Sequence, residues 1–299
     1  MNTQQESVPS SSAGGAAGHS AVDRDERYGR LILRNKDYVT ENLQKKIRNT
    51  KLLIAGCGIG SSFAEVAVRL GFENFILADG DIVSTHNLNR QSYIAADVGQ
   101  PKVEALAKHL KDINPDTKIE EFHDYLNEHN VAPLVARTDI IFDTIDFLDL
   151  AGIVSLHDAC RQQQKPIITA LAIGWGAGCI YFPPDCNCSF RKLFALPETG
   201  SVANANYVDT FAVVIERLAS RLDPTVVHAV GKALTMMEDG KPCPASQVSP
   251  GAFSVGALAG TLVVRILAGD KEIKQAPELL IADMSAVLLS PGINLLEND

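Results

Sequence analysis

Side chains that suit a phosphorylated ligand are concentrated between residues 51 and 102. Two carboxylates, Asp79 and Asp81, follow an apolar run, and two cations, Arg90 and Lys102, come after them in a polar loop. A carboxylate at the end of a strand can accept hydrogen bonds from ribose hydroxyls. Arginine and lysine side chains bind phosphate oxygens. This order of residues favours a nucleotide site, and the alternative is that the two cations are solvated surface charges.

A glycine turn precedes these residues and contains Gly56, Gly58 and Gly60. Glycines after a strand let the backbone approach a phosphate at a helix N-terminus. The dinucleotide fingerprint has its third glycine at the position of Ser61, so the match is incomplete. A tight turn without a ligand is the alternative. Ribose is common to NAD and ATP, but a triphosphate needs cations along its length, so Arg90 and Lys102 favour ATP.

A second pair of carboxylates, Asp143 and Asp146, follows a later apolar run. In an open α/β sheet, this position is the edge at which ligands bind. A carboxylate there could hold Mg²⁺ between phosphate oxygens. The alternative is that one of them caps the following helix.

Apolar runs alternate with helical patterns through the first two thirds of the chain, which predicts an α/β fold with a Rossmann-like, doubly wound, mostly parallel sheet. The expected strands are 51–55, 74–78, 118–122, 139–142 and 167–172, and the expected helices are 40–48, 62–70, 101–112, 127–136 and 148–163. Beyond Gly174, the pattern predicts an antiparallel C-terminal portion with a strand at 177–182 and two strands within 278–290. A helical insert is expected at 206–221 and 224–237, and an apolar helix at 252–267.

The composition of the chain argues against several classes of protein. The net charge of −9 over 299 residues argues against non-specific binding to nucleic acid or to an anionic membrane. We expect no membrane span, because no run of about 18 uncharged apolar residues is evident. The N-terminus lacks the pattern of a secretory signal. Six cysteines without a disulfide framework favour a reducing compartment, hence a cytoplasmic location. Residues 1–22 are rich in Ser, Gly and Ala and are expected to be disordered.

Five motifs occur together in an order that resembles the ThiF/MoeB/HesA family, whose members are similar to the adenylation domain of ubiquitin-activating enzymes. These are RYGRLIL, the glycine turn, DGDIVSTHNLNRQ, GQPK and DTID. The resemblance extends over residues 23–184, and again at SPGAFSVGALAGTLVVRIL within 249–267. It implies a single ThiF-type adenylation domain at 23–299. Its parts would be a helical arm (23–50), a nucleotide-binding core (51–184), a loop and helical insert (185–250), and a C-terminal core helix with strands (251–299).

The same resemblance implies roles for individual residues. Asp79 would hold the ATP ribose with Asp81 nearby, and Asn87 and Arg90 would contact phosphates. Lys102 would lie beside the reacting phosphates, and Asp146 would hold Mg²⁺. Arg30 would reach the γ-phosphate in a neighbouring subunit, which implies a homodimer with shared sites.

The implied reaction is attack by the C-terminal carboxylate of a ubiquitin-like protein or a small peptide on the α-phosphate of ATP, giving an acyl-adenylate and pyrophosphate. Two alternatives stay open: a non-catalytic half of a heterodimeric activating enzyme or an ATP-binding scaffold, and an NAD-dependent oxidoreductase. The substrate and the final acyl acceptor are not indicated by the sequence.

The chain departs from the family pattern in its cysteines. Many relatives carry two C-x-x-C pairs that bind structural zinc, whereas this chain has Cys186, Cys188 and a separate Cys243. We therefore predict no zinc site. Any of the three could also be the cysteine that takes up the acyl group as a thioester in some relatives, or could be incidental.

Overall fold

The computed structural model describes residues 21–202, 205, 214, 216–238 and 246–291. Within these ranges, seven strands form one sheet in the order β3-β2-β1-β4-β5-β6-β7. The strands are β1 Lys51–Ala55, β2 Asn74–Ala78, β3 Lys118–Phe122, β4 Ile140–Asp143, β5 Ile167–Ile173, β6 Gly176–Phe182 and β7 Leu280–Asp283. Strands β1 to β5 are parallel to one another. Strand β6 is antiparallel to both of its neighbours, β5 and β7. This confirms the predicted fold class.

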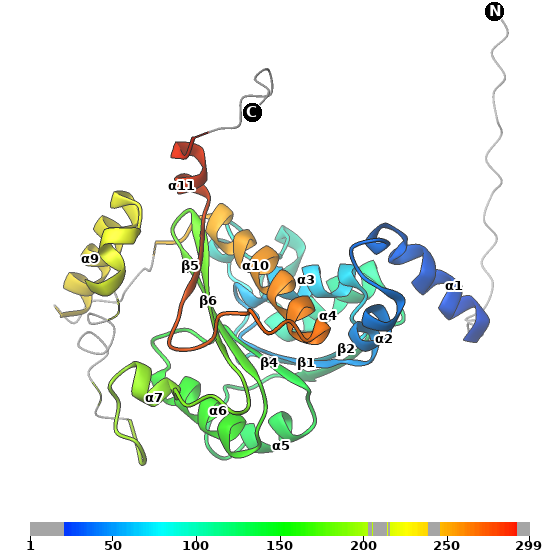
Figure 1. Cartoon of the computed structure of the whole chain (residues 1–299), viewed down its shortest axis with the longest axis horizontal. Helices are drawn as coiled ribbons and strands as arrows, with labels where there is room; N and C mark the ends of the chain where they lie inside the picture. Colours follow the sequence, from blue (N-terminus) through cyan, green and yellow to red (C-terminus); the bar gives the residue numbers. More distant parts are fainter. Residues whose placement is uncertain (1–20, 203–204, 206–213, 215, 239–245, 292–299) are drawn as a thin grey trace, which may run out of the picture.

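Helices cover both faces of the sheet (Figure 1). One face carries α3 (Gly60–Leu70), α4 (Lys102–Ile113) and α10 (Ser249–Ala268), and the other carries α5 (Val131–Ala136), α6 (Leu150–Gln162) and α7 (Phe190–Leu193). Alternate residues of the central strand supply the two cores: Leu52 and Ile54 face one, and Leu53 and Ala55 the other. A strand buried on both faces has to be apolar throughout, which explains the KLLIA run.

The remaining helices lie at the edges of this sandwich (Figure 1). Near the N-terminus are α1 Ala21–Leu31, the 3₁₀ helix η1 Leu33–Asn35 and α2 Glu41–Asn49. The loop before α4 contains η2 Thr85–Asn87 and η3 Ala95–Asp97. Later in the chain are η4 Ala219–Arg221, α9 Pro224–Glu238 and α11 Met284–Leu289. The predicted disordered tail lies almost wholly outside the described residues, as does most of the helix expected at 206–221.

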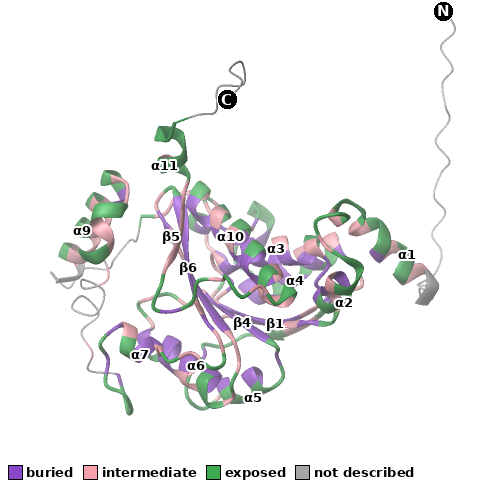
Figure 2. Cartoon of the chain, in the orientation of Figure 1, coloured by how far each residue is buried: buried purple, intermediate pink, exposed green. Residues whose placement is uncertain are grey.

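Helix α10 packs closely against α3 because small residues line the contact. A Cβ on Gly256 would lie 2.6 Å from the carbonyl oxygen of Ser62, and the Ser62 hydroxyl donates a 2.8 Å hydrogen bond to the carbonyl of Ala252. Among the described helices, α10 is long and apolar enough to cross a membrane by length and composition. Every stretch of 18 residues in α10 includes Arg265, so the helix is not an uncharged run, and the expectation of no membrane span stays a prediction. In the structure the buried side of α10 faces α3 and the sheet (Figure 2).

The last element differs from the expectation of two terminal strands. Only 280–283 form a strand, and residues 284–289 form α11. The carboxylate of Asp283 accepts hydrogen bonds from the backbone N–H groups of Ser285 and Ala286, which is the interaction of a helix N-cap. A short apolar run fits a strand or a helix equally well. Here the N-cap at Asp283 favours the helix.

The strand order reverses at β1, which pairs with β2 on one side and β4 on the other. A crevice forms outside the carboxyl ends of the strands at such a switch point. The residues after β1, β2 and β4 therefore converge on one place.

Candidate active site

Asp79 joins the end of β2 to the glycine turn that follows β1. Its carboxylate accepts hydrogen bonds from the backbone N–H of Cys57 at 2.7 Å and of Asp81 at 2.8 Å. Burial raises the pKa of Asp79, an effect that the nearby Lys102 ammonium and these N–H donors oppose. Asp79 thus holds the glycine turn in place at the end of β2.

Lys102, the first residue of α4, lies beside the two carboxylates that follow β2. Its ammonium lies 2.6 Å from an oxygen of Asp81 and 4.0 Å from one of Asp79. The side chain is only 8% exposed, so its charge needs these carboxylates. Pro101 precedes Lys102 as the residue before the helix, and the backbone N–H of Lys102 donates to the carbonyl of Asp81.

Asp81 accepts a second hydrogen bond, from the hydroxyl of Tyr125. Burial alone would raise the pKa of Asp81, but the hydrogen bonds from Lys102 and Tyr125 lower it below the ordinary value. The same bond to Asp81 raises the pKa of Tyr125 to about 12. Asp81 is therefore a fixed anion that holds Lys102.

The glycines of the turn are needed for contacts within the chain. Gly56 has a positive φ of +89°, and a Cβ there would lie 2.5 Å from the carbonyl oxygen of Thr144. A Cβ on Gly60 would lie 2.5 Å from the Thr144 hydroxyl. A Cβ on Gly58 would instead lie 3.3 Å from the side-chain nitrogen of Gln91. The tight turn that was the alternative to a phosphate loop therefore accounts for Gly56 and Gly60, whereas Gly58 faces the polar side chain of Gln91.

Arg90 is held by the loop after β2 and by the segment that leads into α10. Its guanidinium donates to the side-chain oxygen of Gln247 at 2.6 Å, to the carbonyl of His86 and to the side chain of Asn89. All three partners are neutral. Burial lowers the pKa of Arg90, and the carboxylate of Asp146 opposes that shift. Arg90 and Asp146 are thus near enough to interact electrostatically.

Asn87 is buried, and its side-chain oxygen accepts from the backbone N–H of Ser84 at 2.9 Å. It stabilises η2, the short helix that begins the loop carrying Arg90.

The two carboxylates at β4 have different surroundings. Asp143 is buried and its carboxylate contacts the Thr169 hydroxyl at 2.9 Å and the His157 ring at 3.2 Å. Asp146 is exposed, and one oxygen accepts from the backbone N–H of Leu148. Neither caps α6, because Asp149 does so through the N–H of Gly152. Asp143 is thus a core residue, and Asp146 is the carboxylate that solvent or a ligand can reach.

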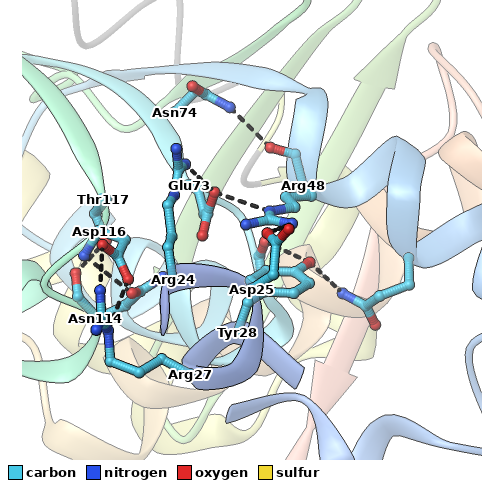
Figure 3. A network of polar contacts seen from close by, with 12 residues as sticks. Arg24, Asp25, Arg27, Tyr28, Arg48, Glu73, Asn74, Asn114, Asp116 and Thr117 are labelled. Atoms are coloured by element: carbon cyan, nitrogen blue, oxygen red, sulfur yellow. Dashed lines mark hydrogen bonds and ion pairs between the residues drawn. The ribbon is translucent and has the colours of Figure 1, made fainter. Parts of the chain in front are cut away.

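Arg30 lies at the opposite edge of the sheet from these residues. Helix α1 is fixed beside Glu73 and Asp116, which precede β2 and β3, so it lies at the amino edge of the sheet (Figure 3). The Arg30 side chain is 79% exposed, and within the described part of the chain it forms an ion pair with Glu26 on its own helix and with no other residue. The structure joins Asp79, Asp81 and Lys102 directly, places Arg90 and Asp146 on the segments that follow β2 and β4 at the same edge of the sheet, and leaves Arg30 outside.

Four further residues contact the site but were given no role on the basis of the sequence: Gln91, Tyr125, Thr144 and Gln247. Gln91 is part of the NLNRQ motif, and its buried side-chain oxygen has no hydrogen-bond partner among the described residues. That motif could have identified Gln91. Tyr125 and Gln247 come from distant segments and carried no local signal.

The cysteine-containing segment lies apart from this site. Cys186 and Cys188 are free and half-buried, and they line a cavity of about 490 Å³ with Lys192, Arg217 and the segment Gln275–Pro277. Across the described residues, no group of three or more Cys, His, Asp or Glu side chains is arranged to hold a metal ion. Cys243 lies outside those residues, so the zinc prediction stays a prediction.

The fold is that of the doubly wound α/β proteins, with charged residues gathered at the switch point. The model of the ThiF family matches residues 28–290, and the chain belongs to that family.

Curated relatives agree with this assignment. The sulfur carrier protein ThiS adenylyltransferase of Escherichia coli (strain K12) is 32% identical over 165 residues, which cover 54% of this chain and 64% of the relative. The SAMP-activating enzyme E1 of Haloferax volcanii is 28% identical over 180 residues, covering 59% and 65%. The chain thus spans less than two thirds of the length of these relatives.

Solved structures share the fold. The crystal structure of PaaA has a TM-score of 0.62 at 18% identity and covers 91% of this chain and 82% of that one. The structure of E. coli MccB with ATP has a TM-score of 0.59 at 20% identity, with coverage of 86% and 71%. At these identities the likeness concerns the fold alone.

Proposed function

We propose that this protein is an ATP-dependent adenylyltransferase that activates the C-terminal carboxylate of a partner protein or peptide as an acyl-adenylate. The observation that carries the proposal is that the segments following β1, β2 and β4 at the switch point carry a paired Lys102, an Arg90 held by neutral groups and an exposed Asp146 that acts electrostatically on Arg90. Two cations and one accessible carboxylate suit a triphosphate with its divalent cation. The names of relatives, which include adenylyltransferases and an activating enzyme, support this function.

The site has unused binding capacity that fits a nucleotide. Arg90 donates only to neutral acceptors among the described residues, so its charge is available to phosphate oxygens. The side chain of Gln91 lies near Gly58, and no described residue forms a hydrogen bond with its buried oxygen. A buried polar atom without a partner is costly, and a ligand group could satisfy it. Asp79 would accept from the ribose, and Lys102 would exchange part of its contact with Asp81 for phosphate.

Asp146 fits a role in holding Mg²⁺. It is exposed, lies at the carboxyl end of β4 and is near Arg90. Mg²⁺ is commonly bound by one or two carboxylates together with phosphate oxygens and water. When bound, the ion would neutralise phosphate charge and so lower the repulsion of an incoming carboxylate.

In the proposed reaction, a carboxylate oxygen of the partner forms a bond to the α-phosphorus of ATP. The bond from the α-phosphorus to the bridging oxygen breaks, and pyrophosphate leaves with the electron pair. Both reactants are anions, so the cationic side chains of Arg90 and Lys102 offset their repulsion and stabilise the charge that develops on the leaving group. No general base is needed, because the attacking carboxylate is already ionised.

We also propose that Arg30 acts in a homodimer, at the site of the second copy. Its own helix lies at the other edge of the sheet, so it does not serve the site of its own chain. Among the described residues its one ion pair is an exposed contact with Glu26. Such pairs contribute little to stability, so little free energy is lost when Arg30 leaves Glu26 for a phosphate. The domain limits at 23–299, the cytoplasmic location and the absence of nucleic-acid and membrane partners belong to the same proposal.

Exchange of labelled pyrophosphate into ATP tests this function. The assay would use small proteins that end in Gly-Gly and are encoded near the gene, together with short peptides. We expect one of them to drive exchange, and Arg90→Ala or Asp146→Ala to abolish it. Asp112→Asn, a change in an exposed pair on α4, is the matched control. Exchange that survives both changes would contradict the proposal. ATP binding without exchange in a homodimer would favour the scaffold alternative, and tighter binding of NADH than of ATP would favour the oxidoreductase alternative.

A further inference from the structure

Helix α1 is attached to the body mainly by charged and polar contacts. Of its side chains from Asp23 to Leu31, only that of Tyr28 is buried. Three arginines make the other contacts: Arg24 and Arg27 extend from α1, and Arg48 extends from α2 (Figure 3). A helix without a broad apolar face takes its position from such directional contacts.

Glu73 is the centre of this network. It lies directly before β2, its side chain is 2% exposed, and one carboxylate oxygen accepts from Arg24 at 2.6 Å and from Arg48 at 3.0 Å. Arg48 continues the connection to α1, because it pairs with Asp25 at 2.8 Å and its guanidinium lies 4.1 Å from the centre of the Tyr28 ring. One buried carboxylate thereby joins α1 and α2 to the sheet.

Further contacts fix the rotation of α1 about its axis. Arg27 makes a two-point contact with the carboxylate of Asp116 at 2.9 and 3.0 Å. The Tyr28 hydroxyl donates to the carbonyl of Gly71 at 3.0 Å and accepts from Gln44. Gly71 has a φ of +101°, and a Cβ there would lie 2.6 Å from both polar groups.

The other oxygen of Glu73 and the Nε of Arg24 are buried, and neither has a hydrogen-bond partner in the part of the chain that the structure describes. Glu73 therefore contributes one carboxylate oxygen to the attachment of α1, beside the separate contacts of Arg27 and Tyr28. A network that is only partly satisfied is weaker than a complete one. The position of α1 thus depends on the negative charge of Glu73.

We propose that Glu73 is the positioning residue for Arg30, fixing the helix that presents this arginine to the nucleotide site of a second copy. The proposal rests on the proposed function, in which Arg30 contacts a partner's triphosphate. Arg30 itself contacts nothing outside α1 among the described residues, so its direction is set by whatever holds the helix. Glu73 would then act on the site of the other subunit and leave the site of its own chain unaffected.

Hybrid dimers separate these two effects. One chain carries Arg30→Ala and keeps an intact nucleotide site. The other carries Arg90→Glu, which repels a triphosphate from its own site, and keeps Arg30. A different affinity tag on each chain allows the mixed dimer to be isolated. Its one intact nucleotide site lies on the first chain and is completed by Arg30 of the second chain. Glu73→Gln is then placed on either chain, and the affinities for ATP and for AMP are measured by titration.

We expect Glu73→Gln on the Arg30-donating chain to lower ATP affinity by about tenfold, since a charge-assisted contact is lost. AMP, which lacks the β- and γ-phosphates, should bind unchanged. On the other chain, Glu73→Gln should change neither affinity by more than about twofold, as should Asp112→Asn on either chain. Hydrogen exchange of residues 21–31 should speed up wherever Glu73→Gln is present.

Other results would overturn the proposal. Equal loss of ATP affinity in both placements would show a general structural role, and no loss in either would show that Glu73 does not position Arg30. If the parent hybrid binds ATP no better than the Arg30→Ala homodimer, the shared site itself is wrong, and so is the positioning role. Failure of the wild type to bind ATP at all would instead contradict the proposed function.

Discussion

The ammonium of Lys102 lies 2.6 Å from a carboxylate oxygen of Asp81, and this pair links the start of α4 to the loop after β2. Asp81 is thus the partner of the lysine that we propose contacts the phosphates of ATP. A paired lysine is fixed in direction before the ligand arrives, which reduces the cost of ordering it during binding.

The pair should be visible in the dependence of stability on pH. The pKa of Asp81 is lowered in the folded state, so its contribution is present above the unfolded value of about 3.9 and is lost as pH falls through the folded value. Asp81→Asn should cost about 0.5–1 kcal/mol at pH 6, a small value because Asp81 is 47% exposed. The difference from wild type should shrink below pH 4 in urea unfolding. A difference that grows in acid would contradict the assignment, and Asp112→Asn serves as the control.

Substitutions in the glycine turn should separate packing from ligand binding. Gly56→Ala combines a strained φ with a clash against Thr144 and should cost about 3 kcal/mol or more. Gly99→Ala has a similar φ of +90° and open space around it, so it should cost only about 1 kcal/mol. Denaturant unfolding of both variants measures the part due to the clash. Equal costs for the two would show that Gly56 is required for its φ alone.

Gly58→Ala is expected to behave differently from either. Its Cβ would press on the Gln91 amide at 3.3 Å, and a side chain can move away. Stability should change by less than about 1 kcal/mol, whereas ATP affinity should fall because Gln91 is displaced at the site. Calorimetric titration and unfolding together give both values. Loss of stability with unchanged ATP affinity would assign Gly58 to the fold.

Much of the fold followed from the sequence because each central strand is an apolar run that ends at Gly or Asp. The prediction failed at residues 284–289, where the run MSAVLL fits either a strand or a helix and the cap at Asp283 decided the outcome. Within the site, the sequence grouped Asp79, Arg90 and Lys102, since these follow one another in a single stretch. The contact between Arg90 and Gln247 spans 157 residues and could be found only from the folded chain.

Gln247 should act through Arg90. Its side-chain oxygen accepts a 2.6 Å hydrogen bond from the guanidinium, so Gln247→Ala should loosen Arg90 and weaken ATP binding about fivefold, the value of one hydrogen bond. Arg90→Ala should weaken binding on the order of a hundredfold, as expected for loss of a charged donor. The double variant should bind like Arg90→Ala, which titration can establish. Additive losses would show that Gln247 acts independently.

The two carboxylates at the end of β4 should have opposite effects when removed. Asp143→Ala leaves Thr169 and His157 buried without their partner and should cost about 3 kcal/mol or more in unfolding free energy. Asp146→Ala removes an exposed side chain and should change stability by less than about 0.5 kcal/mol. It should nevertheless abolish the dependence of ATP affinity on Mg²⁺, measured by titration with and without the ion. If Asp143→Ala were stable and lost that dependence instead, the buried carboxylate would be the metal ligand, and the division of roles at this strand end would be reversed.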